Sequence, residues 1–206
     1  LLEDTPQHCR MIKFFSPILT TGELEKIRNG EKSGVRSVTF RITFNADEGY
    51  DAMEKSLSTL FEEVEGRIDR GAEFIILSDK SVDRENAPIP SLMACSGLHH
   101  YLIRKKKRNR VAILMETGEP REVMHFALLV GYGADAVCPY LVFATLRDLG
   151  QGVKFDQGIT AEMTDDIYIN AMGKGLLKIM SKMGTSTLRS YRGAQIFEAV
   201  GLSKGV

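Results

Sequence analysis

The sequence predicts an α/β fold, in which strands and helices alternate and the strands form a mainly parallel sheet. Apolar runs with strand character recur at residues 37–44, 73–77, 111–115 and 136–138. Each run is followed by a segment in which apolar residues stand three and four positions apart, a spacing typical of amphipathic helices. Strict alternation implies parallel strands joined by right-handed crossovers. Four such units are too few to close an eight-stranded barrel, so we expect a partial barrel or an open sheet.

The chain begins with residues 5–29, which we expect to form a loop and one short helix. Thr21 is placed to cap this helix. Glu23 and Glu25 would lie in its first turn, where a carboxylate complements the positive end of the helix dipole. The chain starts at Leu1 and not at a methionine, so we expect it to be a piece of a longer polypeptide.

The first two strands have different patterns. Apolar and polar residues alternate through 37–44, as in a strand with one buried face. Asp47 can cap the helix that follows, and Gly71 is placed to end it. Residues 73–77 are almost uninterrupted apolar residues, which is typical of a strand buried on both faces. The next residues, 78–90, predict a polar loop that contains proline.

The remaining β/α units follow in the same order. A helix over about 90–108 precedes the strand at 111–115, and a helix over 120–132 precedes the strand at 136–138. Pro139 is expected to start another helix, because proline suits the first positions of a helix.

Composition divides the chain into three parts. Residues 1–149 form the β/α body with its N-terminal loop and helix, and the glycine-rich residues 150–158 are expected to be a linker. Residues 159–206 hold a long helix, expected over about 160–183, and a terminal junction. Gly184 is the predicted end of that helix.

Charge argues against nucleic acid and membrane as partners. Lys plus Arg and Asp plus Glu are equal at 27 each, so no net field attracts a polyanion. A basic run at 104–110 would suit nucleic acid, but we favour a helix end, where cations complement the dipole. No apolar run approaches the roughly 20 residues that span a bilayer, and no signal peptide opens the chain.

Three cysteines, Cys9, Cys95 and Cys138, are far apart in the sequence. Their number and spacing argue against a disulfide framework, a zinc site or an iron–sulfur cluster held within this chain. We expect Cys95 and Cys138 to be inert core thiols, and we expect a reducing intracellular compartment.

Candidate catalytic residues follow the strands, because ligands of parallel α/β folds bind at the loops after strands. Asp79 and Glu116 could form a carboxylate pair for acid–base chemistry or for a metal ion. We favour another interpretation, in which both cap the following helices and accept bonds from backbone amides. Neither a histidine nor a third acid stands at matching spacing.

The histidines and glycines do not predict a metal or phosphate site. His99 and His100 are adjacent, so on a helix they diverge by about 100° and cannot share a metal. His125 is expected on a separate helix, and all three should be satisfied helix-face residues. The sequence has no glycine-rich phosphate loop after a strand and no nucleophile motif.

The most informative stretch is 174–202, KGLLKIMSKMGTSTLRSYRGAQIFEAVGL, which breaks a helical pattern with a dense polar run. It closely resembles the junction in glutamate synthases where the central domain meets the FMN-binding synthase domain. Residues 73–100 and 115–141 resemble the body of the same central domain. The resemblance covers about residues 5–202.

This resemblance implies a modular oxidoreductase. In the family, a glutaminase domain with a cysteine nucleophile, a central domain, an FMN-binding barrel with a [3Fe–4S] cluster and a β-helix follow one another. The enzyme hydrolyses glutamine, channels ammonia and reductively aminates 2-oxoglutarate to glutamate, in the cytoplasm or a plastid. The central domain is expected to resemble the FMN barrel in topology, to bind no cofactor, to be inactive alone, and to couple the glutaminase and FMN-synthase domains of the same polypeptide.

The junction carries the residues that we expect to touch the synthase domain. Arginine and tyrosine anchor interfaces well, because each combines a large apolar surface with directional donors. We expect this chain alone to leave them partly unpaired. The junction residues are Ser186, Arg189, Tyr191, Arg192 and Gln195.

Other interpretations stay open at this point. Arg192 could simply pair with Glu198, on the next helical turn. The junction loop, 186–195, could instead contact the flavin or the 2-oxoglutarate pocket of the complete enzyme. Alternatively, the chain could be an independent β/α enzyme that uses Asp79 or Glu116.

Overall fold

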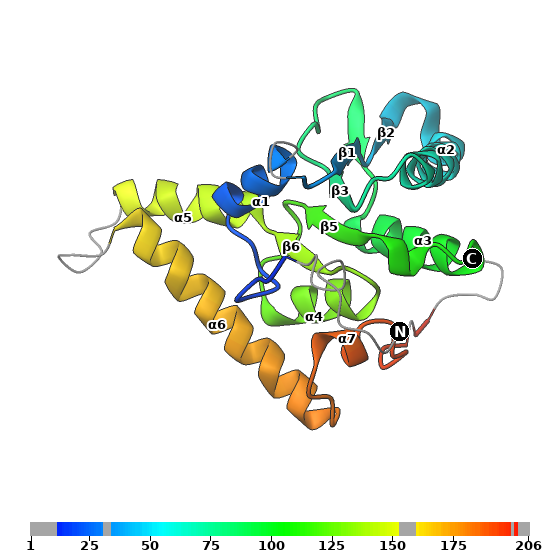
Figure 1. Cartoon of the computed structure of the whole chain (residues 1–206). Helices are drawn as coiled ribbons and strands as arrows, with labels where there is room; N and C mark the ends of the chain where they lie inside the picture. The colour runs from blue at the N-terminus through cyan, green and yellow to red at the C-terminus, as the bar shows by residue number, and fades with distance from the viewer. Residues whose placement is uncertain (1–11, 31–33, 153–159, 199, 202–206) are drawn as a thin grey trace.

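A computed structural model describes residues 12–30, 34–152, 160–198 and 200–201. Figure 1 shows a central sheet with helices on both faces and one long helix, α6, along the side of the molecule. No helix within the described ranges combines the length and apolarity that crossing a membrane requires.

Four strands form the central sheet: β1 (Ser37–Arg41), β3 (Phe74–Ser78), β5 (Ala112–Glu116) and β6 (Ala136–Cys138). Their order is β1-β3-β5-β6, and all neighbouring pairs are parallel. The α/β prediction of parallel strands with intervening crossovers is therefore confirmed.

The predicted single strand at 37–44 is wrong in one respect, because it breaks at Ile42. The Ile42 N–H still donates to the Ser78 carbonyl of β3 (2.9 Å), whereas the Ile42 carbonyl accepts from the Ile89 N–H (2.9 Å). Beyond this residue the chain leaves the sheet as β2 (Thr43–Asn45), which pairs antiparallel with β4 (Asn86–Pro88). The region predicted as a polar loop therefore contains a short strand.

The first helix, α1 (Thr21–Arg28), begins one residue earlier than predicted. Thr20 is its cap: the Thr20 hydroxyl accepts from the Glu23 N–H (3.2 Å), and the Glu23 carboxylate accepts from the Thr20 N–H (2.8 Å). The assignment of Thr21 as the cap is therefore wrong, because only Thr20 lies three residues before a glutamate.

Asp47 does not cap the next helix either. It lies in a 3₁₀ turn, η3 (Ala46–Glu48), which the Asn45 side chain caps, and α2 (Gly49–Asp69) starts directly after that turn. The predicted end of α2 is confirmed, because Gly71 follows with a positive φ of 94° that only glycine adopts at low cost.

The middle of the chain contains α3 (Ser91–Arg104), the 3₁₀ turn η4 (Arg108–Arg110) and α4 (Val123–Gly131). The helix predicted over 90–108 is thus shorter, and the basic run lies partly beyond it. Only Arg104 is in the last turn of α3, whereas Arg108 is buried. The helix-dipole explanation of this run is therefore wrong for Arg108, which the fold surrounds with acceptors described below.

Three helices complete the chain: α5 (Tyr140–Gly152), α6 (Ala161–Lys182) and α7 (Leu188–Tyr191). Because α5 continues through Gly152, the first residues of the predicted linker are helical, and residues 153–159 lie outside the described ranges. The Thr160 hydroxyl caps α6 by accepting from the Met163 N–H (3.2 Å). The junction, expected as a loop, contains the short helix α7.

Alternating residues of the strands pack on opposite faces of the sheet. One face supports α2, α3 and α4 through a large apolar cluster that includes Ile75, Ile113 and Val137. The other face supports α1 and α5 through Ile76, Leu114 and Cys138. This two-sided burial explains why the central strands are apolar at nearly every position.

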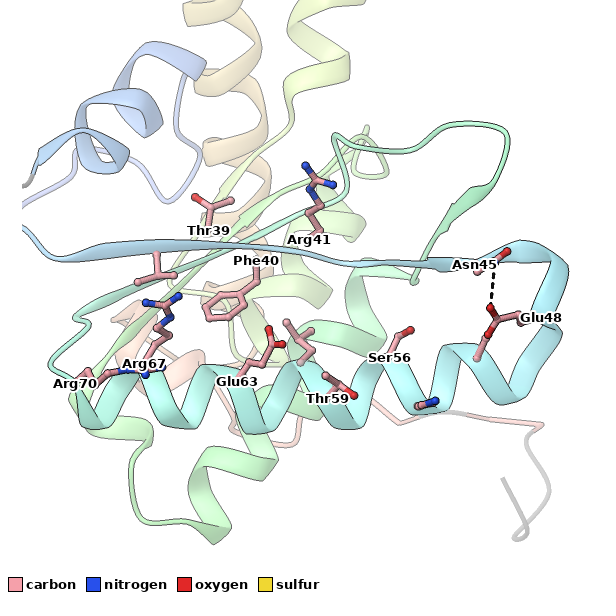
Figure 2. A pocket seen from close by; sticks show the side chains of 14 residues that line it. Thr39, Phe40, Arg41, Asn45, Glu48, Ser56, Thr59, Glu63, Arg67 and Arg70 are labelled. Atoms are coloured by element: carbon pink, nitrogen blue, oxygen red, sulfur yellow. Dashed lines mark hydrogen bonds between the residues drawn. The ribbon is translucent and has the colours of Figure 1, made fainter.

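A third apolar cluster joins α6 and α7 to the outside of α4. It consists of buried Ala127, Val130, Leu176, Met180 and Tyr191. This cluster holds the C-terminal junction against the β/α body. On the opposite side of the molecule, a groove of about 760 Å³ runs between β1 and α2 (Figure 2).

Candidate functional site

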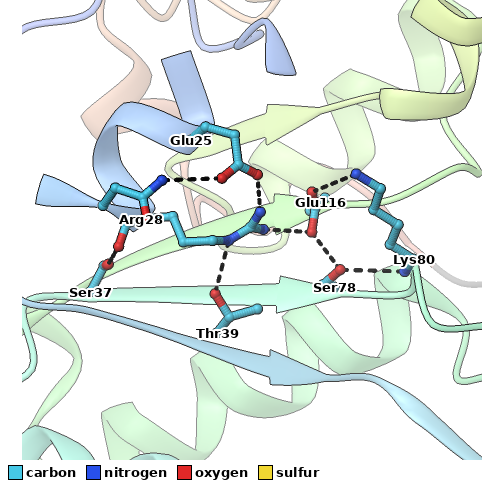
Figure 3. Close-up of polar contacts among 8 residues, drawn as sticks. Glu25, Arg28, Ser37, Thr39, Ser78, Lys80 and Glu116 are labelled. Atoms are coloured by element: carbon cyan, nitrogen blue, oxygen red, sulfur yellow. Dashed lines mark hydrogen bonds and ion pairs between the residues drawn. The ribbon is translucent and has the colours of Figure 1, made fainter. Parts of the chain in front are cut away.

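The carboxyl ends of the parallel strands bring several polar side chains to one edge of the sheet. Ser78 on β3 lies beside Glu116 on β5 in the strand register. Asp79 and Thr117 follow directly. Figure 3 shows Glu116 pointing to Ser78, to Arg28 from α1 and to Lys80 from the loop after β3. Ligands of parallel α/β folds bind at this edge of the sheet, which is why Asp79 and Glu116 are candidate residues in the sequence.

Glu116 is buried, with 1% of its surface exposed, and is neutralised by cations from other elements. Its Oε2 accepts from Arg28 Nη2 (2.7 Å) and from Ser78 Oγ (2.5 Å). Lys80 Nζ lies 4.0 Å from its Oε1, which has no hydrogen-bond partner among the described residues. Arg28 also pairs with Glu25 and donates to Thr39 Oγ1 (3.3 Å). The guanidinium is therefore shared between carboxylates.

Asp79 is buried separately from Glu116 and has its own donors. Its carboxylate accepts from Thr117 Oγ1 (2.5 Å), from the Gly118 N–H (3.1 Å) and from the Tyr140 hydroxyl. Burial raises the pKa of Asp79, and these donors partly offset that effect. The carboxylate is thus fixed between the loops after β3 and β5.

The structure does not bring Asp79 and Glu116 together as a catalytic pair, because each carboxylate bonds to its own set of partners. The expected bond to a backbone amide is confirmed for Asp79 at Gly118. The expected helix caps are wrong, because Pro90 precedes α3 and Glu122 precedes α4, neither with a side-chain cap bond. Across the described ranges, no three acidic, histidine or cysteine side chains are grouped to hold a metal ion.

Two cysteines lie in the core on opposite faces of the sheet. Cys95 belongs to the cluster under α2–α4, and Cys138 to the cluster under α1 and α5. Burial raises the pKa of each thiol to about 12, so both are protonated at neutral pH. The expectation of core thiols is confirmed for these two, and Cys9 lies outside the described residues.

The junction is fastened to the β/α body by Tyr191. This side chain is fully buried, and its hydroxyl donates to the Ala127 carbonyl of α4 (3.2 Å). Next to it, the Gly193 N–H donates to the Gly131 carbonyl (2.8 Å), and the Tyr132 hydroxyl donates to the Phe197 carbonyl (3.3 Å). Backbone and side chain together position the junction on the end of α4.

A charged cluster beneath the junction, which we call the arginine clasp, consists of His99, Arg108, Asp135 and Arg192. The Asp135 carboxylate accepts from Arg108 Nη2 (2.8 Å) and from the Ile113 N–H (2.8 Å), and it pairs with Arg192 Nη1. Asp135 precedes β6, so one carboxylate ties β5, η4 and the junction together.

Arg108 is the buried centre of the clasp. It donates to His99 Nδ1 (3.0 Å) and to the carbonyls of Val111 (2.8 Å) and Gly133 (2.8 Å). Burial lowers the pKa of Arg108 and of Arg192 from their ordinary high values. Burial, and next the positive charge of Arg108, lower the pKa of His99 to about 4. The imidazole is therefore neutral and accepts a bond through Nδ1.

The three histidines within the described residues have different surroundings. His99 lies on α3 and is satisfied by Arg108, as expected, and it is buried within the clasp. His100 is exposed, and His125 Nδ1 accepts from the Arg121 N–H (3.1 Å). All three lie on helices, as expected, His99 and His100 on α3 and His125 on α4.

Two of the junction residues have partners within this chain. Tyr191 and Arg192 are both bonded within the chain, and Arg192 pairs with Asp135 and not with Glu198. The sequence interpretation missed Asp135 and Arg108 because both are remote from the junction in sequence.

Three of the five junction residues remain available at the surface. Ser186, Arg189 and Gln195 are exposed. Gln195 has a φ of 55°, an unusual conformation for a residue with a side chain. Contacts of these residues with another domain remain a prediction.

Comparison with known families matches nearly the whole chain to one family model. A family model described as the glutamate synthase central domain matches residues 1–203. The glutamate synthase (NADH) of Schizosaccharomyces pombe is 40% identical over 100% of this chain and 10% of its own length. The glutamate synthase (NADPH) large chain of Bacillus subtilis is 41% identical over 100% of this chain and 13% of its own.

A ferredoxin-dependent relative also matches the whole of this chain with a small part of its own length. The ferredoxin-dependent glutamate synthase of Pyropia yezoensis is 38% identical over 100% of this chain and 14% of its own length. The chain therefore spans only 10–14% of the length of these three relatives.

Solved structures of similar fold are flavin enzymes at low identity. A mutant flavocytochrome b2 with benzoylformate has a TM-score of 0.55 at 11% identity, covering 87% of this chain and 54% of that one. A mutant mandelate oxidase with a monooxide FMN adduct has a TM-score of 0.53 at 13% identity, covering 83% and 57%. The predicted topological likeness to an FMN barrel is thus confirmed at the level of the fold.

Proposed function

The chain belongs to the glutamate synthase central-domain family, and from this premise we propose that it couples a glutaminase domain to an FMN-binding synthase domain of one longer polypeptide. The complete polypeptide would convert glutamine, 2-oxoglutarate and a reductant into two molecules of glutamate. The chain itself would catalyse no step. Its partners would be the two catalytic domains, in a reducing compartment of the cytoplasm or a plastid.

The chemistry of the described residues supports a role without catalysis. At the carboxyl edge of the sheet, Asp79 and Glu116 are buried, and each carboxylate already accepts hydrogen bonds from its own donors. The core thiols of Cys95 and Cys138 are protonated by burial. A general acid, a general base or a nucleophile needs an accessible group, and an acid or base works best when its pKa lies near the operating pH.

The described residues also do not fit the cofactors that the family uses. A flavin phosphate at the strand ends would face the carboxylates of Asp79 and Glu116, and Arg28 is already paired with Glu25 and Glu116. An iron–sulfur cluster cannot be shared by Cys95 and Cys138, which lie on opposite faces of the sheet. FMN and the [3Fe–4S] cluster would therefore be bound by other parts of the polypeptide.

The observation that carries the proposal is the attachment of the junction to the body. Arg192 pairs with Asp135 at the start of β6, and Tyr191 and Gly193 bond to α4. The path of the chain toward its C-terminal neighbour is therefore fixed by the sheet. Arg189 and Gln195 on the same segment are exposed and would contact that neighbour.

The test replaces Arg189 with alanine in the complete enzyme. The amount of 2-oxoglutarate consumed for each glutamine hydrolysed should fall, because a displaced synthase domain receives ammonia less efficiently. Arg104→Ala, which removes another exposed arginine from α3, is the matched control and should leave the ratio unchanged. An unaltered ratio for Arg189→Ala would contradict the proposal that this residue belongs to the coupling surface.

A further inference from the structure

The groove between β1 and α2 lies along a sheet edge that no strand covers within the described ranges. In Figure 2, Phe40 points from β1 toward α2, while Glu63 and Arg67 rise from the helix. The groove of about 760 Å³ extends from Arg70 at one end to Asn45 and Glu48 at the other.

Backbone geometry makes the outer edge of β1 a free pairing surface. The Phe74 N–H donates to the Arg36 carbonyl (3.1 Å), and the Ile42 N–H donates to the Ser78 carbonyl (2.9 Å). In a parallel ladder, the peptide groups of every second residue face the same neighbouring strand, and those of the residues in between face the opposite side. The two bonds show that the even-numbered residues of this segment face β3. The peptide groups of Thr39 and Arg41 therefore face away from β3.

The opposite edge of the sheet shows how this fold covers such a surface. An extended segment runs parallel to β6: the Leu19 N–H donates to the Val137 carbonyl (2.9 Å), and the Val137 N–H donates to the Pro17 carbonyl (2.8 Å). One edge is thus closed by the chain's own backbone. The edge at β1 has no equivalent among the described residues.

Charge gives the groove a preference among peptide segments. Its lining includes Arg41, Lys55, Arg67 and Arg70 against Glu48 and Glu63. None of these four cations has an ion pair with a described residue, whereas Glu48 accepts from Asn45 Nδ2 (3.1 Å). An acidic segment would therefore find cations that form no ion pair with any residue the structure describes.

We propose that an extended, acidic segment of the parent polypeptide, from outside this chain, pairs with the outer edge of β1 and occupies the groove. The five residues of β1 offer a pairing length of about 17 Å at about 3.3 Å per residue. Addition of a strand to an open edge is a common mode of peptide recognition. The chain spans 10–14% of its relatives' length, so most of the polypeptide lies outside it. The inference rests on the proposed function only for the identity of this longer polypeptide.

The test compares amide hydrogen exchange in the isolated chain and in the complete enzyme. In the complete enzyme, the amides of Thr39 and Arg41 should exchange at least about tenfold more slowly than in the isolated chain, because pairing protects them. The amide of Val137, which is already paired, should show the same protection in both proteins and serves as the internal reference. Equal exchange of Thr39 and Arg41 in the two proteins would overturn the proposal.

Charge reversals then identify the occupant. Arg67→Glu combined with Arg70→Glu in the complete enzyme should restore rapid exchange at Thr39 and Arg41, whereas Arg104→Glu on α3 should not. Protection that persists in the double variant would rule out an acidic segment. Protection that appears in the isolated chain as its concentration rises would show a second copy at the edge and would equally overturn the proposal.

The two proposals fail independently. Loss of coupling in Arg189→Ala with unprotected β1 amides would leave the coupling function standing and remove the docking segment. Protected β1 amides together with normal coupling in Arg189→Ala would leave the docking segment standing and contradict the coupling surface at Arg189.

Discussion

Replacing Asp135 with asparagine removes the one negative charge shared by the two arginines of the clasp. The wild-type carboxylate accepts from Arg108 and Ile113 and pairs with Arg192. An asparagine oxygen could still accept from the Ile113 N–H. It could not neutralise two guanidinium groups, one of which is 8% exposed.

The magnitude follows from the burial of the partners. Removal of one member of a buried ion pair costs about 3–5 kcal/mol, and a hydrogen bond to a charged group contributes about 1.5–3 kcal/mol. The side chains of Asp135 and Arg192 are 22% and 24% exposed, so water recovers part of the loss. We therefore expect Asp135→Asn to lower the free energy of unfolding by about 2–3 kcal/mol.

Urea unfolding of the isolated chain measures this change. With a slope of about 2 kcal/mol per molar urea, the midpoint should fall by about 1–1.5 M and the slope should not change. Asp69→Asn is the matched control, because this carboxylate also pairs with two cations, Lys107 and Arg110, but lies at the surface. Its midpoint should move much less.

Two results would refute this reasoning. An Asp135→Asn midpoint within error of the Asp69→Asn midpoint would mean that the clasp contributes no more than a surface ion pair. Additive effects of Asp135→Asn and Arg192→Ala in a double-mutant cycle would mean that the two residues are not energetically coupled.

Three further predictions address the clasp, the junction turn and the chemistry of the chain. The folded pKa of His99 is lowered to about 4 from 6.5. As the pH decreases from about 6.5 to about 4, the free energy of unfolding of the wild type should therefore fall relative to that of His99→Asn, because the unfolded chain binds the proton first. Equal pH profiles for the two proteins in urea titrations would contradict this. Gly193 has a φ of 71°, and an added Cβ would lie 3.1 Å from His99 Nε2. Gly193→Ala should thus lower the thermal midpoint and cost about 1–2 kcal/mol, whereas Gly173→Ala, in open space on α6, should gain about 0.5–1 kcal/mol; a neutral Gly193→Ala would argue against the close contact. Finally, the isolated chain should form no glutamate from glutamine and 2-oxoglutarate with any reductant, and should retain no flavin absorbance after gel filtration with FMN; turnover or co-elution would show catalytic or flavin-binding residues within it.

The parallel sheet could be predicted from sequence because its signals are local. Each central strand is a short apolar run, and each crossover helix has its own apolar spacing, so neither depends on distant residues. The N-terminal cap could also have been found, because Thr20 precedes Glu23 by three positions and Thr21 does not. By contrast, the strands at Thr43–Asn45 and Asn86–Pro88 are three residues long and carry little apolar pattern. Their pairing depends on the bend at Ile42.

The candidate site was harder to predict because its bonds join remote segments. The basic run at 104–110 gives no sign that Arg108 is buried. Its acceptors at Gly133 and Asp135 follow α4, 25 and 27 residues later in the sequence. Arg192 was recognised as a junction residue, but its partner could not be found by searching nearby sequence for a carboxylate. The sequence places Glu116 and Asp79 at strand ends, and only the structure shows that the two carboxylates bond to separate sets of donors.

The most direct test of the coupling function is the stoichiometry of the complete enzyme carrying Arg192→Ala. Arg192 joins the junction to the sheet through Asp135, and its loss should cost about 1.5–3 kcal/mol, as for a hydrogen bond to a charged group. Arg147→Ala, which breaks the Arg147–Asp165 pair (2.8 Å) between α5 and α6, is the control. We predict that Arg192→Ala consumes less 2-oxoglutarate for each glutamine hydrolysed while Arg147→Ala keeps the normal ratio. Equal consumption of the two substrates by the Arg192→Ala enzyme would contradict the claim that this junction couples the two reactions.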